Sequence, residues 1–563
     1  MQQPKRGDLP RIEEATTDSA GVVAWTTSGV VMLDTMPFEN LDLERPTPMQ
    51  RFVAGEAFFN YANFGSLRPW REPIRLTSSR YVGLAVQFAL CGFAYFFFSY
   101  AYCQLLAEEI KAVDEGQVEA AQYVLIWPQC CAVLFGFLSD TLPIKGVRRK
   151  SYMIVGWLLS LVMFGVVAIL DSLVWGDSGD ARDHHNASQS KALLAVSVFA
   201  CIGIQITWIA AMAASVEIAQ SEPLRHRGET QATLICLYHA GGALAQAVTG
   251  GFAIVAPSGE LSQSTLTLTN AAAIMMVVTI LALPFIVLLY EEEPPVDAFS
   301  SLGVSARRQF VEFWKFCHQN VVRRVVFFAT CHLFFVGFFS DSVRDAVAEW
   351  SHVGAVEELF VNIVRMTAMA LGILVWRYLM LNSCWKRVAT WGSAFHLLCY
   401  AVVTLLTTLN VVRAPWFYGL MMALSDVPRA WLVLYATLLT TEIADIGREG
   451  MTLGLVISFQ MLSGLAVFTL AEVLPGLFGG DVTMDQVHAD KPSTHEIVGT
   501  SYAVTLGVNL LSFFWIRMLP QQKLDAQQLR AFGGYNRIAG VVIAVMFLVL
   551  LVFNLTANVM VVL

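Results

Sequence analysis

The sequence predicts an all-α integral membrane protein with two six-helix bundles and one extra transmembrane helix at the C-terminus. The 563-residue chain has a mean hydropathy of +0.58, and only 14% of its residues are charged. Soluble domains carry about 25% charged residues, so this chain has too few polar side chains to cover a soluble core. Apolar runs of about 20 residues, the length that crosses a bilayer as a helix, recur as two groups of six and one more.

Polar segments divide the chain into five parts. We expect a tail over 1–79, a six-helix bundle over 80–290, a hinge loop over 291–322, a second bundle over 323–518, and a linker with the extra helix over 519–563. The predicted membrane spans are 80–106, 119–140, 150–171, 192–219, 229–255, 270–290, 323–343, 355–380, 387–409, 415–440, 450–475, 498–518 and 537–560.

The tail over 1–79 is polar and rich in proline. It has no basic start followed by an apolar core, so we expect no cleaved signal peptide. We expect it to be flexible and cytosolic. Within it, the segment 52–64 fits either a short interfacial helix or a partly ordered linker.

Basic residues gather in alternate loops. They are Lys145 to Lys150, Arg225 and Arg227, Arg307 to Arg324, Lys386 and Arg387, Arg448, and Lys523 to Arg537. The positive-inside rule places these loops, and with them the N-terminus, in the cytosol. The sequon that starts at Asn186 then lies outside and is a predicted glycosylation site. We therefore expect a multi-pass protein of the plasma membrane.

Two six-helix halves joined by a cytosolic hinge describe the major-facilitator architecture, in which the halves rock about a site near the middle of the membrane. The turn between the second and third helices carries Gly136, Asp140 and the basic cluster Arg148, Arg149 and Lys150. We expect these five residues, the latch, to hold the cytosolic side closed, with Gly136 allowing close helix contact. The alternative is that the cluster only anchors the topology. The equivalent turn of the second half, 372–393, lacks the aspartate.

Charged residues inside predicted spans are costly and are therefore functional candidates. Arg365 lies near the middle of the eighth helix, while Asp426 and Arg429 share one face of the tenth. Asp426 and Arg429 either neutralise each other or bind solute. Arg365 either binds an anionic solute, for which its planar fork is suited, or pairs with another helix.

Other polar residues in the predicted spans complete the candidate site. Tyr238, His239 and His332 are candidates for substrate binding, although a structural role fits His332 better. Asp426 and Glu217 are candidates for carrying a proton that drives transport.

Several functions have no support in the sequence. The ten cysteines lie mostly in apolar runs and form neither a disulfide framework nor a metal motif. There is no phosphate-binding GxxxxGK[ST] loop, no nucleophile constellation and no basic-aromatic surface for nucleic acid. We expect no cofactor, no metal and no enzymatic activity, and as partners only the lipid bilayer, a small solute and protons.

The latch also has a more specific pattern. Ser139-Asp140, Pro143-Ile144, Gly146, Arg148 to Lys150 and Tyr152 form SD-x-x-PI-x-G-x-RRK-x-Y, which resembles the folate–biopterin transporter family of the major facilitators. Gln87, Val216-Glu217, Arg227-Gly228, Gln231, Gly241-Gly242 and the segment 519–529 fit in order. Gln129, Ala132 and Gln460 stand where the family usually has Trp, Lys and Asn.

The resemblance implies a secondary transporter, a symporter that moves a folate- or pterin-like solute by alternating access with a proton as the coupling ion. Two alternatives stay open because of the departures. One is a membrane receptor or scaffold that keeps the fold without transporting. The other is a transporter of another small organic anion or of S-adenosylmethionine.

Overall fold

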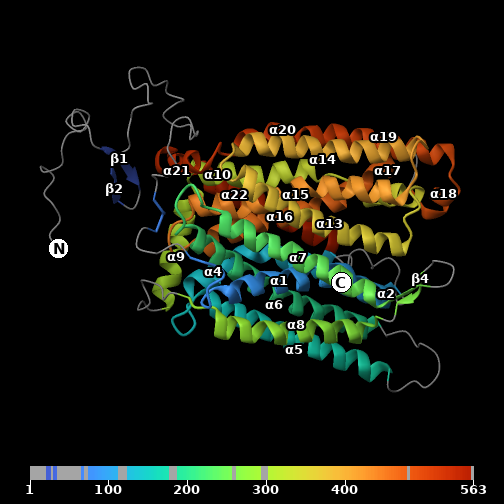
Figure 1. Ribbon diagram of the computed structural model, residues 1–563, viewed down its shortest axis with the longest axis horizontal. Helices are drawn as coiled ribbons and strands as arrows, with labels where there is room; N and C mark the ends of the chain where they lie inside the picture. The colour runs from blue at the N-terminus through green and yellow to red at the C-terminus, as the bar shows by residue number, and fades with distance from the viewer. Residues whose placement is uncertain are drawn as a thin grey trace, which may run out of the picture.

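The computed structural model describes residues 21–26, 29–34, 65–68, 74–111, 123–175, 187–255, 261–264, 266–292, 302–478 and 482–559. The predicted glycosylation site Asn186 and the segment 52–64 lie outside the described residues. The long helices run side by side along one common direction, with α1 to α8 in one group and α10 to α20 in the other (Figure 1).

The N-terminal bundle contains the helices before the hinge. They are α1 (Val82–Phe97), which runs on through a π-helical turn into α2 (Cys103–Lys111), α4 (Ala132–Thr141), which follows a 3₁₀ turn at Trp127–Cys131, α5 (Arg149–Trp175), α6 (Ala187–Ala219), α7 (Glu229–Gly251) and α8 (Leu268–Leu289).

The C-terminal bundle follows α9 (Leu302–Cys317). Its members are α10 (Asn320–Phe327), α11 (Leu333–Val336), α12 (Asp341–Trp350), α13 (Ala355–Val375), α14 (Trp385–Thr408), α15 (Pro415–Ile443), α16 (Glu449–Ala471), α17 (Val473–Leu477), α18 (Met484–His488), α19 (Pro492–Leu510) and α20 (Ser512–Trp515). The polar helix α21 (Lys523–Phe532) and the extra apolar helix α22 (Arg537–Asn554) come last.

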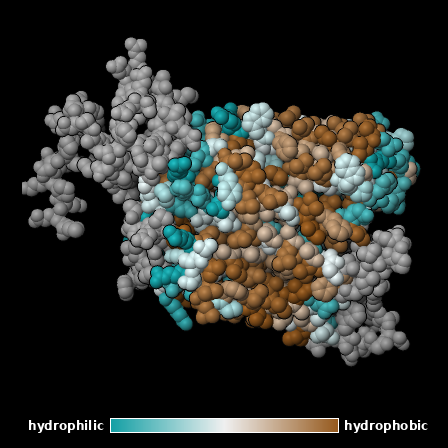
Figure 2. All heavy atoms as spheres, in the orientation of Figure 1, coloured by the Kyte–Doolittle hydropathy of each residue, from teal (hydrophilic) through white to brown (hydrophobic). Residues whose placement is uncertain are grey.

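Ten helices in the described part of the chain are long and apolar enough to cross a membrane. They are Val82–Ala107, Tyr123–Thr141, Arg149–Ser172, Ser190–Ala219, Leu268–Leu289, Val356–Met380, Trp385–Thr408, Glu449–Leu477, Pro492–Met518 and Arg537–Ala557. An eleventh span forms if the pair Asn320–Val336 and Asp341–Trp350, bent by 42°, is counted as one. Figure 2 shows the resulting hydrophobic band, with hydrophilic residues toward its two ends.

The helices α7 and α15 are the two remaining predicted spans. They have 23 and 29 residues, enough to cross the hydrocarbon, but they are more polar than the ten. Tyr238 and His239 on α7, and Asp426 and Arg429 on α15, contribute to this polarity and are candidate site residues. Both helices pack against α13, and Tyr238, His239 and Asp426 are buried among the helices.

Glycine allows the closest helix contacts between the two bundles. A Cβ atom on Gly136 of α4 would collide with the carbonyl oxygen of Gly450 on α16, and a Cβ on Gly454 would meet the backbone of Ala132. Small residues at such crossings let backbones approach and gain van der Waals contact. The pair α4 and α16 therefore forms a tight seam between the bundles.

Two short antiparallel hairpins accompany the helices: β1 (Gly21–Thr26) with β2 (Gly29–Asp34), and β3 (Ala253–Val255) with β4 (Leu261–Ser264). The first pairs Gly21 with Asp34 through Thr26 with Gly29. It lies in the segment that the sequence predicts only as a flexible tail. Two short apolar runs, 22–25 and 30–33, stand close together in the sequence there, and such a pair favours a hairpin.

The two ends of the bundles differ. The end that carries α9 and α21, at the left of Figure 1, also carries the latch. We call it the hinge end, because the predicted hinge lies there. Residues 65–68 of the tail also lie at this end, where Arg68 is buried. Arg68 is thus packed against the bundles, unlike the flexible tail expected from the sequence.

Candidate functional site

Three charged side chains meet well inside the C-terminal bundle. Arg365 on α13 donates a hydrogen bond from Nε to Oδ2 of Asp426 on α15 at 2.6 Å. Arg429, one turn after Asp426, donates from Nη1 to the other carboxylate oxygen at 3.0 Å. The Asp426 side chain is only 1% exposed, whereas that of Arg429 is 49% exposed. Two arginines share one carboxylate, so this group of three, the central charge cluster, carries a net positive charge.

Residues of the N-terminal bundle lie close to the helices that carry the central charge cluster. The helix α7, which carries Tyr238 and His239, packs against both α13 and α15. Tyr238, next to His239, stacks on Trp208 of α6 with ring centroids 4.3 Å apart. The candidates Arg365, Asp426, Arg429, Tyr238 and His239 therefore come together where the two bundles meet.

Further aromatic rings extend this region of the N-terminal bundle. The ring of Phe96 lies 5.3 Å from that of Tyr238 and 6.0 Å from the imidazole of His239. Tyr95 lies 6.1 Å from Tyr238. Such a wall offers flat apolar surface together with hydroxyl groups, which suits an aromatic solute.

His239 is unusual among the buried histidines. Its side chain is buried, yet neither ring nitrogen has a hydrogen-bond partner among the residues that the structure describes. Buried polar groups are nearly always hydrogen-bonded. His239 therefore has hydrogen-bonding capacity that the protein itself does not use.

The other two histidines have structural partners. Nδ1 of His332 lies 3.1 Å from the carbonyl oxygen of Ser512, and its Nε2 lies 3.3 Å from the hydroxyl of Ser393. Nδ1 of His396 lies 3.0 Å from the carbonyl oxygen of Ser425. His332 is thus held between helices of the C-terminal bundle, in contacts that do not include the central charge cluster.

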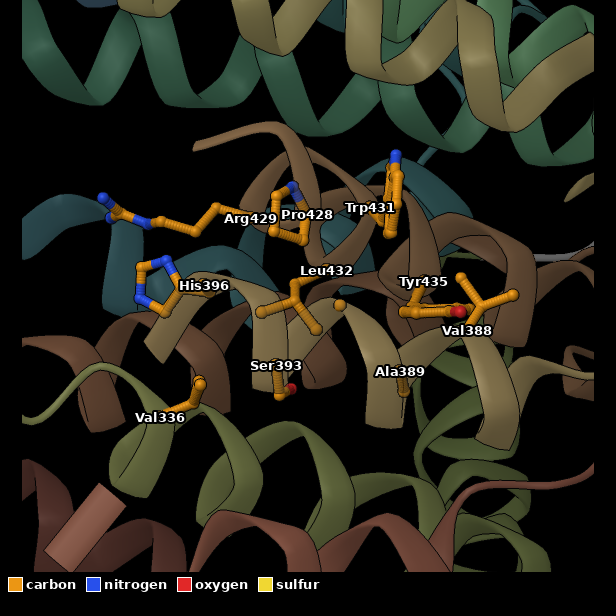
Figure 3. Close-up of a pocket in the computed structure, with 11 residues that line it drawn as sticks. Val336, Val388, Ala389, Ser393, His396, Pro428, Arg429, Trp431, Leu432 and Tyr435 are labelled. Carbon is orange, nitrogen blue, oxygen red and sulfur yellow. The ribbon is translucent and has the colours of Figure 1, made fainter. Parts of the chain in front are cut away.

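A narrow pocket opens beside Arg429, lined by His396, Ser393, Tyr435 and other residues of the C-terminal bundle (Figure 3). It is barely large enough for one water molecule. All of its lining residues belong to the C-terminal bundle, and Arg429 connects the pocket to the central charge cluster.

At the hinge end, Asp140 of α4 reaches across to the start of α16. Its two carboxylate oxygens accept hydrogen bonds from the backbone nitrogens of Gly450 and Met451, at 3.2 and 2.6 Å. These are among the first N–H groups of α16, which have no partner within the helix. A carboxylate there also opposes the positive end of the helix dipole. Asp140 therefore caps a helix of the other bundle.

Arg149 connects the acidic residues of the hinge end. Its guanidinium lies 2.6 Å from Asp140, 2.7 Å from Glu217 and 3.2 Å from Glu449, and it donates to the hydroxyl of Ser139. The side chain is completely buried. Glu217, the second candidate proton carrier, is thus an ion-pair partner of the latch, located far along the fold from Asp426.

The remaining basic residues of the latch have different contacts. Arg148 donates to the carbonyl oxygen of Gly447 at 3.3 Å and lies 3.6 Å from Glu217. Lys150 donates to the carbonyl oxygens of Val287 and Tyr290 at the end of α8. Among the described residues, Lys150 therefore binds its own bundle, whereas Arg148 also reaches the other bundle.

Glu292 completes the start of α5. Its carboxylate accepts hydrogen bonds from the backbone nitrogens of Arg148, Arg149 and Lys150, between 2.7 and 2.9 Å. Burial raises the pKa of Glu292, while these hydrogen bonds oppose the shift. The capping of α5 by Glu292 parallels the capping of α16 by Asp140.

A second set of contacts joins the bundles beside the latch. Arg227 forms a buried ion pair with Glu442 at 3.0 Å, and Nε2 of Gln231 donates to the hydroxyl of Thr441. Lys523 of α21 donates from Nζ to the carbonyl oxygen of Leu224 at 3.1 Å. Burial lowers the pKa of Lys523 to about 7, although the Glu442 carboxylate opposes the shift.

These contacts show which side of the molecule is closed. The ion pairs and hydrogen bonds of Asp140, Arg149, Arg227 and Lys523 all join the two bundles at the hinge end. Each spans groups that must separate if the bundles rock apart there. The conformation is therefore one in which the hinge end is sealed.

The sequence singled out Asp140 and its basic cluster, but not the other charged residues that close the hinge end. Arg68, Glu442 and Lys523 gave no signal as interface residues, because each lies in a polar stretch typical of a loop or linker. A buried position for a charged residue depends on which segments the fold brings together, and local sequence does not report that.

The described residues contain no group of three or more His, Cys, Asp or Glu side chains placed to hold a metal ion. All ten cysteines are free thiols. Several buried charged residues are instead paired with one another across helices, as Arg149 is with Asp140 and Arg365 with Asp426.

No protein-family model matches the sequence, and no curated protein matches it. Among solved structures, the human organic anion transporter MFSD10 (TETRAN) is similar, with a TM-score of 0.51 and 15% identity over 77% of this chain and 98% of that chain. A double-tryptophan mutant of XylE is also similar, with a TM-score of 0.50 and 17% identity over 79% of this chain and 98% of that chain.

The proton:xylose symporter XylE of the major facilitator superfamily, bound to 6-bromo-6-deoxy-D-glucose, matches with a TM-score of 0.49 and 15% identity over 80% of this chain and 98% of that chain. At such low identities the similarity to MFSD10 and the XylE mutant shows the fold and leaves the solute open. With its apolar helices in two bundles and an extra helix after them, the chain is a multi-pass membrane protein with the major-facilitator fold.

Proposed function

We propose that this protein is a secondary transporter that moves a folate- or pterin-like organic anion by alternating access. The observation that carries the proposal is the central charge cluster, in which Arg365 and Arg429 share the single carboxylate of Asp426. A net positive charge inside a membrane protein is costly and is offset when an anion binds. The guanidinium fork of Arg365 suits a planar carboxylate or a pterin edge.

The neighbouring aromatic residues support a planar solute. Tyr238, stacked on Trp208, gives a flat surface in the N-terminal bundle, and His239 has unused ring nitrogens among the described residues. A solute held between Arg365 and this wall contacts both bundles at once. Such a site is the one that a rocking transporter needs, because each half then changes its contacts during the cycle.

For the orientation, we propose that the hinge end faces the cytosol of a cell with this protein in its plasma membrane. The alternation of basic loops supports this orientation. The sealed hinge end then closes the solute site from the cytosol. This conformation is the one that receives solute from outside.

Asp426 is the candidate proton carrier that the geometry favours. An anion that draws Arg365 away leaves Asp426 with Arg429 as its remaining arginine. A buried carboxylate that loses a cation binds a proton more readily, which couples solute binding to protonation. Glu217 is paired with Arg149 in the latch, so its protonation affects the opening of the hinge end instead.

A receptor or scaffold without transport is the second candidate. The pocket beside Arg429 is too small for an organic solute, and the charges of the central cluster pair with one another. In that case these charges only hold α13 against α15, and no solute crosses.

Measuring solute uptake into proteoliposomes distinguishes a transporter from a receptor or scaffold. The purified protein is reconstituted, and uptake of radiolabelled folate, biopterin and S-adenosylmethionine is measured with and without an inward proton gradient. We expect saturable uptake of folate or biopterin that the gradient accelerates. Arg377→Lys, on the same span as Arg365, is the matched control and should transport normally. Folded protein that takes up none of the three contradicts the proposal.

A further inference from the structure

The seal at the hinge end contains a component that belongs to neither bundle. Residues 65–68 of the N-terminal tail lie against it, and the side chain of Arg68 is 8% exposed. Nε of Arg68 donates to Oε1 of Gln220 at 3.0 Å, and its backbone nitrogen donates to the carbonyl oxygen of Gln220 at 3.1 Å. Its Nη2 forms an ion pair with Glu449. Arg68 therefore bridges a residue at the end of α6 and the first residue of α16.

A second contact fixes the same segment. Nη2 of Arg227 donates to the carbonyl oxygen of Gly65 at 3.2 Å. The same Arg227 pairs with Glu442 at the end of α15, and Gln220 itself donates to the carbonyl oxygens of Thr441 and Ala444. The groups that hold residues 65–68 are thus supplied by both bundles. We call Gln220, Arg227 and Glu449 the tail socket.

Charge balance gives Arg68 a specific role. Six charged side chains form one connected set of ion pairs: Arg68, Arg148 and Arg149 with Asp140, Glu217 and Glu449. Their charges sum to zero only when Arg68 is included. Without it, a set of buried groups keeps an uncompensated negative charge, which is unfavourable in a medium that solvates ions poorly.

We propose that the tail socket binds residues 65–68 only while the hinge end is closed, so that the N-terminal tail is a moving part of the gate. The socket exists only when Gln220 and Glu449 lie close together, and rocking the bundles apart at this end separates them. A segment that binds one conformation better than the other shifts the equilibrium toward it. By reciprocity, opening the hinge end releases the tail.

The inference rests on the proposed alternating access, and its test measures conformation instead of transport. Spin labels on Lys145→Cys, in the exposed loop before α5, and on Arg387→Cys, at the exposed start of α14, report the distance between the two bundles at the hinge end. The four half-buried native cysteines, Cys131, Cys236, Cys331 and Cys384, are first replaced. Double electron–electron resonance in nanodiscs then gives the fractions of closed and open molecules, with and without folate.

The variant that tests the tail is Arg68→Ala. Its matched control is Arg80→Ala, because Arg80 belongs to the same stretch of chain but pairs with Glu291 on the surface, where both side chains are largely exposed. We expect Arg68→Ala to raise the ratio of open to closed molecules about tenfold, and Arg80→Ala to leave it unchanged. Arg68→Gln keeps a partner for Gln220 without the charge and should give the same direction if Arg68→Ala folds poorly.

The outcomes are distinct. An open fraction in Arg68→Ala and Arg68→Gln equal to that of Arg80→Ala overturns the tail socket as a part of the gate. A larger open fraction in both Arg68 variants, with no change in Arg80→Ala, supports the tail socket as a part of the gate. If the distance between the two spin labels, in protein that keeps Arg68 and Arg80, is the same with and without folate, the proposed transport cycle is contradicted. The basis of this inference is then lost as well.

Discussion

The carboxylate of Asp140 lies 2.6 Å from the backbone nitrogen of Met451, although the two residues are in different bundles. The same carboxylate pairs with Arg149 of its own bundle. One side chain therefore caps the start of α16 and orients the arginine that reaches Glu449. The seal at the hinge end depends on this double use of a single charge.

Asp140→Asn tests the two contacts of this carboxylate, because it keeps the size of the side chain and removes its charge. The amide nitrogen cannot accept a hydrogen bond, so either the cap of α16 or the contact with Arg149 is lost. Hydrogen bonds to charged groups contribute about 1.5–3 kcal/mol, so we expect normal surface expression with transport slowed about tenfold or more. Initial uptake rates in cells check this. Unchanged kinetics would reduce 136–150 to an anchor of topology.

Gly136→Ala tests the seam between α4 and α16. The added methyl group collides with the backbone of Gly450, and such overpacking costs about 1–3 kcal/mol. Gly165→Ala on α5 is the control, since its Cβ meets only the methyl carbon of Met276 at 3.8 Å. A change from Gly to Ala in an unstrained helix stabilises by about 0.4–1 kcal/mol. Melting temperatures of the purified variants should move in opposite directions, and a Gly136→Ala protein as stable as the wild type would refute the close contact.

Lys523 predicts a pH dependence of stability. Its pKa is about 7 in the folded protein because of burial, whereas a lysine in the unfolded chain titrates near 10.4. At a pH between these two pKa values, Lys523 is protonated in the unfolded chain and deprotonated in the folded protein. Stability contributed by this group therefore rises with pH from about 7 to about 10, by up to about 1.4 kcal/mol per pH unit.

Replacing this lysine by methionine removes the titratable amine, and with it this contribution to the pH dependence of stability, but keeps the volume of the side chain. Relative to the wild type, Lys523→Met should be most stable at pH 6–7 and should lose that advantage by pH 10. Thermal unfolding in detergent at four pH values measures it. The surface residue Lys315, paired with Glu312, provides the control variant Lys315→Met. Parallel pH curves for the wild type and Lys523→Met would show that Lys523 stays charged.

Much of the fold could be predicted from the sequence, because membrane spans are long and apolar and the basic loops alternate. Asp140 stood out because basic residues are enough to fix the topology, and that role does not explain an aspartate among them. Its partner Met451 could not be identified, because the two are 311 residues apart and capping across bundles has no local pattern. Arg68 lies in a polar, proline-rich tail, and only its docked position shows that it closes a set of charges.

The sequence predicted which residues belong to the candidate site better than it predicted which of them pair with each other. Arg365 and Asp426 stood out because charges within spans are expensive. Whether α13 turns Arg365 toward Asp426 depends on how the helices are rotated about their axes, which packing decides. His332 was a candidate on the same argument, but its hydrogen bonds to Ser512 and Ser393 show a role between helices.

The pairing of Arg365 with Asp426 makes a prediction about stability. Arg365→Ala leaves the buried carboxylate with Arg429 as its remaining arginine, so the melting temperature should fall. Adding Asp426→Asn removes the charge that lost its partner, so the double variant should be more stable than Arg365→Ala. A double-mutant cycle gives the coupling free energy. Strictly additive effects would mean that the two side chains do not interact in the membrane.

Equilibrium binding of radiolabelled folate to the purified protein tests most directly whether Arg365 binds the solute. Arg365→Lys keeps the positive charge but replaces the planar fork with a point charge. If Arg365 holds the solute, folate should bind the wild type and Arg377→Lys alike. It should bind Arg365→Lys about ten- to hundredfold more weakly, without a matching loss of melting temperature. Undiminished binding of folate by Arg365→Lys would contradict the account and leave Arg365 as a structural partner of Asp426.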